Sequence, residues 1–325
     1  MTAGESHGPQ LTAIIRGIPS GLALTAEDIN RDLARRQLGY GRGGRMKIEK
    51  DTVAIRSGVR KGYTLGSPIT LVIENRDYQA WRDQMAPEPG ELDNRKVVTR
   101  PRPGHADLVG ALKFAHRDAR NVLERASARE TTARVAAGAI AKAFLGEFGI
   151  QVLGHVVAVG PVRLERAAAW DELVELSQRS SVLLGCVDAE VEQRMKAVVD
   201  EIYRTGDTVG GVFEIVARGV PPGLGSHIAW DTRLDGRLAQ AIVSIQAVKG
   251  VEIGDAIQGA ASFGSAVQDT IHYDRDAGRF TRGSNRAGGI EGGITNGEDV
   301  VVRGLLKPIS TLRRPLESVD LATRE

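Results

Sequence analysis

Two histidines lie in settings that suit proton transfer to or from an anionic group. His7 stands in Gly4-Glu5-Ser6-His7-Gly8, and His105 stands in Arg102-Pro103-Gly104-His105-Ala106-Asp107. A neighbouring phosphate favours the protonated form of histidine, whereas a neighbouring arginine opposes it. Both are therefore candidate general acids. A lone loop histidine is often structural or solvated instead, and that alternative stays open for His105. We assign a structural or solvated role to the four remaining histidines, His116, His155, His227 and His272.

The segment around His7 also matches G-x-S-x-G, the pattern of the serine-hydrolase nucleophile, with Ser6 in the reactive position. That nucleophile requires a strand before the serine and a helix after it. Only three residues precede Gly4, and the residues that follow, Leu11–Ile18, are typical of a strand. The sequence therefore favours His7 over Ser6, and a serine hydrolase built on Ser6 is the weaker alternative.

Arginines gather in three segments rich in glycine or proline, namely RRQLGYGRGGRMK, RPRPGH and LRRP. Arginine beside backbone N–H groups in such loops suits a phosphate or a carboxylate. Ser127–Glu130 predicts a capping box that opens a helix, with Arg125 and Arg129 beside it, and a helix N-terminus favours an anion. A plain helix cap and solvated surface charge are the alternatives.

Two further segments suggest a ligand that approaches the backbone. Residues 286–297, RAGGIEGGITNG, contain glycine pairs that leave room for a planar or phosphorylated group. They lack the G-x-G-x-x-G fingerprint between a strand and a helix, so we exclude a Rossmann site. Lys307-Pro308-Ile309-Ser310-Thr311 adds a cation and two hydroxyls. No spacing of cysteine and histidine indicates a metal site.

Composition is that of an ordinary globular protein with abundant glycine. The 325 residues are 42% hydrophobic and 26% charged, and 39 are glycine. The single Cys186 excludes an internal disulfide and indicates a reducing, cytoplasmic setting. No apolar run approaches the roughly 18–20 residues of a membrane span, and no secretory signal is recognisable. The net charge of +2 gives no reason to expect a nucleic-acid partner.

Hydrophobic periodicity predicts mixed strands and helices. Strands are expected at Leu11–Ile18, Lys47–Ser57, Ile69–Glu74, Gln151–Val159 and Gly211–Ala217. Helices are expected from the Thr25/Asp28 capping box to about Arg36, from Ser127 to Gly146, and over about Asp188–Tyr203. Residues 84–105 are predicted to form a long functional loop.

The chain also contains an internal repeat. FEIVARGVPPGL (Phe213–Leu224) matches LTAIIRGIPSGL (Leu11–Leu22) in character at every position. A predicted helix and a glycine-bearing loop follow each copy, and the second helix carries Leu234, Leu238 and Ile242 on one face. This pattern indicates a duplication around a shared core, with repeat-related units at about 5–60 and 207–260. Chance reuse of proline and glycine in turns is the alternative.

These motifs together resemble the chorismate synthase family. They are AGESHG with RGIPSGL, RRQLGYGRGGRM, RPGHAD, RASARETTARVAAGAIAKAFL, SIQAVKGVEIGD, NRAGGIEGGITNG and KPISTL, in family order over essentially the whole chain. The resemblance implies an α+β fold, a β-α-β sandwich with internally duplicated strand-turn-helix units. It implies a single domain over residues 1–325 that assembles as a cytoplasmic homotetramer.

The resemblance also implies an activity. The family is a lyase of the shikimate pathway, the route to aromatic amino acids. It removes phosphate from 5-enolpyruvylshikimate 3-phosphate by an anti 1,4-elimination and so forms chorismate. It requires reduced FMN, and some members bind NADPH to reduce that flavin themselves.

Position by position, the resemblance implies a role for each matching residue. His7 would protonate the departing phosphate, and His105 would protonate or balance the reduced flavin. The substrate-binding residues would be Arg36, Arg42, Arg45, Arg102, Ser127 and Arg129, and Arg36 and Arg42 would also bind NADPH. FMN would contact Arg125, Ala126, Ser127, Gln246, Ala247, Gly292, Lys307, Pro308, Ile309, Ser310 and Thr311.

Two departures from the family pattern accompany the resemblance. Family members begin with a few more residues before Gly4, and they continue beyond the final SVDLATRE with a segment that carries an Arg-Ser-Asp-like motif. The chain is therefore expected to lack both stretches. A truncated relative that binds flavin or a phosphometabolite, with weak activity or none, is accordingly an alternative.

Overall fold

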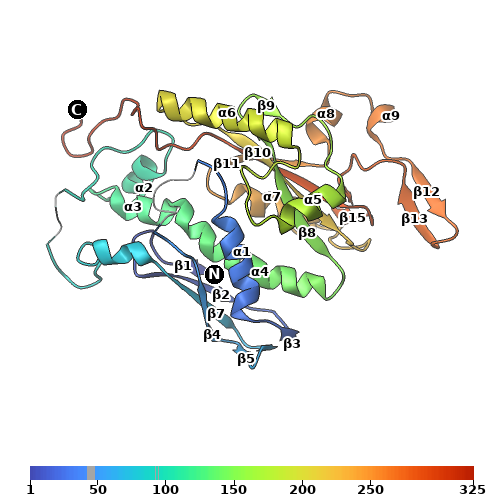
Figure 1. Cartoon of the computed structure of the whole chain (residues 1–325), viewed down its shortest axis with the longest axis horizontal. Coiled ribbons are helices and arrows are strands. Elements are labelled where there is room, and N and C mark those ends of the chain that lie inside the picture. Colours follow the sequence, from blue (N-terminus) through green and yellow to red (C-terminus); the bar gives the residue numbers. More distant parts are fainter. Residues whose placement is uncertain (42–47, 92, 94) are drawn as a thin grey trace. The chain divides into compact units, whose positions relative to one another are not determined.

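The computed structural model describes residues 1–41, 48–91, 93 and 95–325. Arg42 and Arg45, which are predicted substrate-binding residues, lie outside this range. The chain divides into two compact units, traced in Figure 1. Unit 1 comprises Met1–Phe144, Thr205–Thr208 and Ser310–Glu325, and unit 2 comprises Leu145–Arg204 and Val209–Ile309.

Unit 1 contains two antiparallel sheets. The larger sheet has the strand order β1-β2-β7-β4, which are Thr2–Ala3, Gln10–Ile15, Ile69–Glu74 and Val53–Ser57. The smaller sheet has the order β3-β6-β5, which are Ser20–Ala23, Tyr63–Leu65 and Val59–Arg60. In the larger sheet Leu11 pairs with Ile73 and Ala13 with Leu71. Because alternate residues of a strand face the same side, these four form one apolar face.

Two helices cover that face, as Figure 1 shows. Helix α1 (Ala26–Arg36) begins at the predicted Thr25/Asp28 capping box and buries Ile29 and Leu33. Helix α4 (Thr131–Gly146), whose last two residues belong to unit 2, adds a row of alanines and Ile140. Shorter helices follow β7 along the chain: η2 (Arg76–Ala80), α2 (Asp107–Phe114), α3 (Arg120–Ala126) and η3 (Ala128–Glu130).

Unit 2 is built on a five-stranded antiparallel sheet. Its order is β11-β16-β10-β8-β9, which are Val248–Ile253, Val300–Leu306, Gly211–Arg218, Gln151–Val159 and Val162–Arg163. Two hairpins accompany it, β12–β13 (Ile271–Asp274 and Arg279–Arg282) and β14–β15 (Ile290–Glu291 and Ile294–Thr295). Figure 1 shows that β12–β13 extends away from the sheet.

The helices of unit 2 are α5 (Trp170–Gln178), α6 (Ala189–Thr205, ending in unit 1), η4 (Trp230–Thr232), α7 (Leu234–Val243), α8 (Ala256–Ala260) and α9 (Gly264–Val267). Of these, α5, α6 and α7 complete two apolar cores, one on each side of the sheet. Leu173 and Met195 of α5 and α6 pack in one core, and Ile242 of α7 packs with Val302 in the other. Among the described residues no helix is long and apolar enough to cross a membrane.

The two main sheets share their topology. Strands β8, β10, β16 and β11 of unit 2 correspond to β1, β2, β7 and β4 of unit 1, and corresponding neighbours pair antiparallel in both sheets. Along the chain, α7 lies between β10 and β11 as α1 lies between β2 and β4. The duplication itself stays a prediction, which this agreement supports. The copies differ in what is inserted: unit 1 carries residues 75–130 between β7 and α4, and unit 2 carries α8, α9 and β12–β13 between β11 and β14.

Most predicted elements lie close to the observed ones, but within the described residues the strand predicted at Lys47–Ser57 is observed only as Val53–Ser57, and the one predicted at Leu11–Ile18 ends at Ile15. Strands β7 and β8 have the predicted bounds, α6 differs by two residues at most, and the α+β class is confirmed. The capping box predicted at Ser127 is wrong. The Ser127 hydroxyl accepts from Arg129 N–H (3.2 Å) and caps only η3, and the Glu130 carboxylate binds Arg134 (2.8 Å). Helix α4 therefore begins at Thr131.

Candidate active site

His7 is fixed in unit 1 by one residue of α3. The ring Nδ1 lies 2.8 Å from Oε1 and 3.0 Å from Oε2 of Glu124, and the backbone N–H of His7 donates to the same carboxylate at 2.8 Å. The N–H of Ser6 donates to the Glu124 carbonyl at 2.9 Å. The imidazole therefore has a defined position although it stands in a short glycine-bounded loop.

The segment after β7 holds this loop from another direction. The Asn75 amide donates to the carbonyls of Glu5 (3.2 Å) and Gly8 (2.8 Å). Asp77 of η2 places Oδ2 3.8 Å from His7 Nε2, and the Trp81 ring lies 4.2 Å from the imidazole, centroid to centroid. The imidazole therefore stands beside two carboxylates and packs against an indole ring.

Two basic side chains also meet Trp81. Lys96 Nζ lies 3.8 Å and Arg120 Cζ 4.7 Å from the centre of its ring. Arg120 additionally donates to Glu124 Oε1 at 3.1 Å. Basic groups thus share one indole with His7, and such a surrounding suits a negatively charged ligand.

Glu124 is ionised in this setting. Burial alone would raise the pKa of this carboxyl, but hydrogen bonds from the His7 ring and backbone and from Arg120 outweigh burial and lower its pKa. An ionised carboxylate only accepts hydrogen bonds, so His7 Nδ1 carries a hydrogen. The nitrogen that can exchange a proton with a ligand is then Nε2.

His105 has the same kind of support. Its Nδ1 lies 2.5 Å from Oδ1 of Asp107, the first residue of α2, and Arg102 donates to that carboxylate from Nε at 2.9 Å and from its backbone N–H at 3.1 Å. The Asp107 side chain is fully buried. Burial would raise its pKa, but the hydrogen bonds from His105 and Arg102 outweigh that effect and hold its pKa well below the usual range.

A cavity of about 500 Å³ lies beside Arg102 within unit 1. Arg102 Nη1 donates to Thr311 Oγ1 at 2.8 Å, and Arg100, Ser310 and Ser318 also line the cavity. Its size is that of a small-molecule site, and its lining combines two arginines and several hydroxyls with one carboxylate, Glu317. Arg102, Ser310 and Thr311, three predicted site residues, are thus brought together.

Two predicted substrate-binding arginines are tied to carboxylates of the chain itself. Arg129 is 7% exposed; its Nη1 lies 2.6 Å from Asp51 and its Nη2 3.6 Å from Glu49. Arg36 lies 3.4 Å from the same Asp51 and donates to Thr131. These contacts make both arginines part of a mostly buried ionic network behind the His7 loop, and their substrate-binding roles remain predictions.

Arg125 likewise contacts the chain itself. Its guanidinium donates to the carbonyls of Gly4 (3.0 Å) and Thr2 (2.9 Å) and to the Thr2 hydroxyl. Ala126 ends α3, and Ser127 caps η3. The contacts of Arg125 fasten the segment before His7 to α3, next to those of Glu124.

The remaining predicted flavin residues lie in unit 2. Lys307 N–H donates to the Ala247 carbonyl at 2.9 Å, so the segment Gln246–Ala247 meets the start of Lys307–Ile309. Ala247 has φ of 69°, a left-handed conformation that costs energy in a residue other than glycine and concentrates at functional sites. Gly292, in the β14–β15 turn, would present a side chain to open space.

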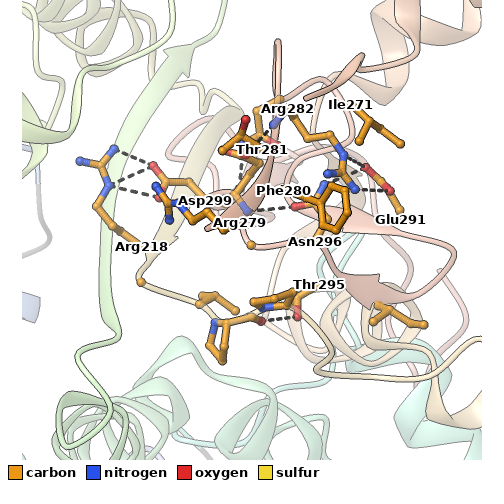
Figure 2. A pocket seen from close by; sticks show the side chains of 18 residues that line it. Arg218, Ile271, Arg279, Phe280, Thr281, Arg282, Glu291, Thr295, Asn296 and Asp299 are labelled. Atoms are coloured by element: carbon orange, nitrogen blue, oxygen red, sulfur yellow. Dashed lines mark hydrogen bonds and ion pairs between the residues drawn. The ribbon is translucent and has the colours of Figure 1, made fainter. Parts of the chain in front are cut away.

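A larger cavity of about 1240 Å³ lies in unit 2 and is lined in part by residues of β12–β13 (Figure 2). Figure 2 shows two ion pairs on its wall, Arg218 with Asp299 (2.7 Å) and Arg282 with Glu291 (2.8 Å). None of the predicted site residues lines it. Its charged side chains occur largely as ion pairs, as Arg102 and Asp107 do beside the smaller cavity.

Sequence reasoning missed the residues that hold the two histidines. Asp107 lies two positions after His105, so its proximity was readable from the sequence. Glu124, Asp77 and Trp81 are distant from His7 in sequence and carry no local signal. The hydrolase interpretation of Ser6 is not supported, because Ser6 is buried and β2 rather than a helix follows it. Among the described residues no three or more His, Cys, Asp or Glu side chains cluster to hold a metal ion.

The fold and the site define an α+β enzyme with two histidine–carboxylate pairs and a cavity lined by arginines and hydroxyls. A family model for chorismate synthase matches residues 1–325. Chorismate synthases from Solibacter usitatus (strain Ellin6076) and Koribacter versatilis (strain Ellin345) are 71% and 60% identical to the chain, over 100% of its length and 84% of theirs. A crystal structure of chorismate synthase superimposes with a TM-score of 0.79 at 46% identity, over 95% of this chain and 84% of that one.

The chain belongs to the chorismate synthase family. Its activity is therefore chorismate formation, a carbon–oxygen lyase reaction on a small-molecule substrate of the shikimate pathway to aromatic amino acids. The alternative of a non-catalytic relative is not favoured.

Proposed function

We propose that the chain eliminates phosphate from 5-enolpyruvylshikimate 3-phosphate with the help of reduced FMN, and that His7 donates a proton to the departing phosphate. The observation that carries this proposal is the fixed His7 imidazole, whose Nδ1 binds Glu124 while Nε2 has Asp77 only at 3.8 Å. In the elimination the electron pair of a ring carbon–hydrogen bond forms a new double bond and the existing double bond shifts. Phosphate leaves with the electron pair of its carbon–oxygen bond, and the ring proton is released to solvent. A phosphate leaves more readily once a proton neutralises part of its charge.

Bound reduced FMN would supply electron density to the reacting ring, with no net oxidation or reduction in the elimination. Its holding residues are proposed to be Arg125, Ala126, Ser127, Ser310 and Thr311 in unit 1, and Gln246, Ala247, Gly292, Lys307, Pro308 and Ile309 in unit 2. One feature fits such a ligand: the open space at Gly292, where the absence of a side chain would allow close approach of a flat ring.

His105 is proposed to hold a proton near the reduced flavin, and Arg102 to bind an anionic group. Asp107 holds both side chains, so their proton and charge are available in one place. We also propose that Arg36 and Arg42 bind NADPH if the chain reduces its own flavin. Assembly as a cytoplasmic homotetramer completes the proposal, since the family resemblance implies it.

The decisive experiment measures chorismate formed by the purified chain from 5-enolpyruvylshikimate 3-phosphate and chemically reduced FMN, without oxygen. His7→Ala is expected to lower turnover by roughly 10²–10⁴-fold, the usual contribution of a general acid. His227→Ala, which changes an exposed histidine of unit 2, is the matched control and should keep normal turnover. Near-normal turnover of His7→Ala would refute the acid role. If FMN and substrate bind next to each other, substrate should tighten FMN binding. An FMN affinity that does not change when substrate is present would argue against adjacent sites.

A further inference from the structure

We propose that Glu124 is a positioning residue of this reaction: it sets the orientation of the His7 ring and supplies the negative charge that keeps the ring protonated before the proton is transferred. This inference rests on the proposed role of His7 as the acid. It concerns a residue of α3 that lies 117 positions away in the sequence.

The first support is geometric. Glu124 receives hydrogen bonds from Ser6 N–H, from His7 N–H and from His7 Nδ1, all between 2.8 and 3.0 Å. One residue thus determines both the path of the backbone at His7 and the direction of its ring. A ring held in this way presents Nε2 in one orientation without a search among rotamers, which lowers the entropic cost of the transition state.

The second support is electrostatic. The Glu124 side chain is 3% exposed, and Arg120 holds its Oε1 at 3.1 Å, so the carboxylate cannot turn away from the ring. Charges interact more strongly in a buried, weakly polar site than in water. The ion pair therefore stabilises the protonated imidazole. Once Nε2 has released its proton, Nδ1–H still donates to Glu124, and the ring stays in place for the next turnover.

Other charged groups facing His7 act in known directions. Asp77 on η2, at 3.8 Å, adds to the effect of Glu124 but makes no hydrogen bond of normal length. Arg120 and Lys96 oppose it, since both are cations that meet the Trp81 ring against which His7 packs. Glu124 is the carboxylate in direct contact with the ring, so its charge is expected to dominate.

The test replaces Glu124 by glutamine, which keeps the shape and removes the charge. Glu124→Gln is expected to lower kcat roughly 10- to 100-fold at pH 7 with a smaller change in KM, because general-acid catalysis depends on the correct protonation state. The alkaline limb of the kcat–pH profile, where the acid has lost its proton, should move to lower pH. Glu124→Asp keeps the charge, so its alkaline limb should stay close to that of the unaltered chain even where kcat falls.

A second measurement reads the ring without catalysis. In the full chain with ¹⁵N-labelled histidine, the His7 signals are identified by their loss in His7→Ala, and their pH dependence is followed by NMR. Glu124→Gln should shift this titration to lower pH. Glu192→Gln is the matched control, because Glu192 is a buried glutamate of unit 2 that accepts three backbone N–H bonds and contacts no histidine.

The outcomes separate this inference from the proposed function. A His7 titration that is the same in Glu124→Gln as in the unaltered chain overturns the inference, whatever the turnover. A shift equally large in Glu192→Gln also overturns it, because the effect would then be a general loss of stability. A fully active His7→Ala variant overturns the proposed function instead. If Glu124→Gln does not fold, Glu124→Asp serves as the test, because it keeps the charge. An alkaline limb and a His7 titration that both differ in Glu124→Asp from those of the unaltered chain would contradict the role of charge.

Discussion

Thr64 of unit 1 and Thr295 of unit 2 make the same two hydrogen bonds. Each hydroxyl donates to a proline carbonyl, at 2.6 and 2.7 Å, and accepts from a leucine N–H, at 2.9 Å in both units. Both threonines are buried, 2% and 3% exposed. The partners are the proline and the leucine of each copy's Pro-x-Gly-Leu turn, at Pro19 and Leu22 and at Pro221 and Leu224.

Because the bonds match, the same substitution at Thr64 and at Thr295 should change the free energy of unfolding by a similar amount. Thr64→Val and Thr295→Val should each lower the free energy of unfolding by about 1–3 kcal/mol, because a leucine N–H and a proline carbonyl, buried or partly buried, lose their partner. Thr64→Ser and Thr295→Ser keep the hydroxyl and should cost less. Urea unfolding of the four variants measures this. A valine variant as stable as its serine counterpart would show that the hydroxyl contributes nothing.

Asp107 gives a prediction that depends on pH. Its pKa in the folded chain lies below the ordinary value of 3.8, because hydrogen bonds from His105 and Arg102 outweigh burial. A lowered folded-state pKa adds stability above the ordinary value, and this stability is lost as pH falls toward the folded-state value. Asp107→Asn should therefore unfold more readily at pH 7, by about 1–3 kcal/mol. The difference from the unaltered chain should narrow below about pH 4.

The same variant should lose activity, since it releases both His105 and Arg102. Asp93→Asn is the matched control: Asp93 also pairs with an arginine, Arg95, but that arginine is fully exposed in solvent. Surface pairs of this kind contribute little. Guanidinium unfolding at several pH values, read beside turnover, checks both parts. A stability difference that stays constant from pH 7 to pH 3 would contradict the role assigned to the ionised Asp107.

A variant of Arg129 can distinguish a structural role of this arginine from a substrate-binding role. It neutralises Asp51 and Glu49, whose side chains are buried, so Arg129→Met should destabilise the chain by roughly 3–5 kcal/mol. Arg31→Met removes an exposed arginine of α1 and should change stability by less than about 0.5 kcal/mol. Thermal unfolding and substrate KM are measured together. Unchanged stability with a raised KM would instead support the direct substrate contact predicted from the sequence.

Local patterns predicted the elements, because their causes are local. The Thr25/Asp28 box starts α1, and alternating apolar residues place β7 and β8 at the expected bounds. Strand order depends on contacts between distant segments, and only the repeated RGxPxGL turn gave a hint of it. The hairpin β12–β13 escaped prediction because its eight strand residues are largely exposed and form no buried apolar face.

The site was predictable in part for the same reason. His7, His105 and the arginines stand in motifs that can be recognised one segment at a time. Their partners cannot: Asp51 reaches Arg129 across 78 positions, and Glu124 reaches His7 across 117. Anion-binding arginines and arginines paired inside the chain have the same local signature, so the sequence assigned Arg129 to substrate and did not reveal its carboxylates.

Cys186 is predicted to be chemically inert in the folded chain. It is 0% exposed in the core that α5 and α6 complete, and burial raises the pKa of its thiol, with the carboxylates of Glu192 and Asp188 adding to that effect. The reactive thiolate is therefore scarce, and a reagent cannot reach it.

An aromatic disulfide reagent at pH 8 should label the folded chain at least about 100-fold more slowly than the urea-unfolded chain, which should yield one thiol per chain. Ser262→Cys, which places a thiol on an exposed turn of unit 2, is the control and should react at once in the folded state. Rapid labelling of the unaltered folded chain would mean that this core opens readily, since no other cysteine is present in the sequence.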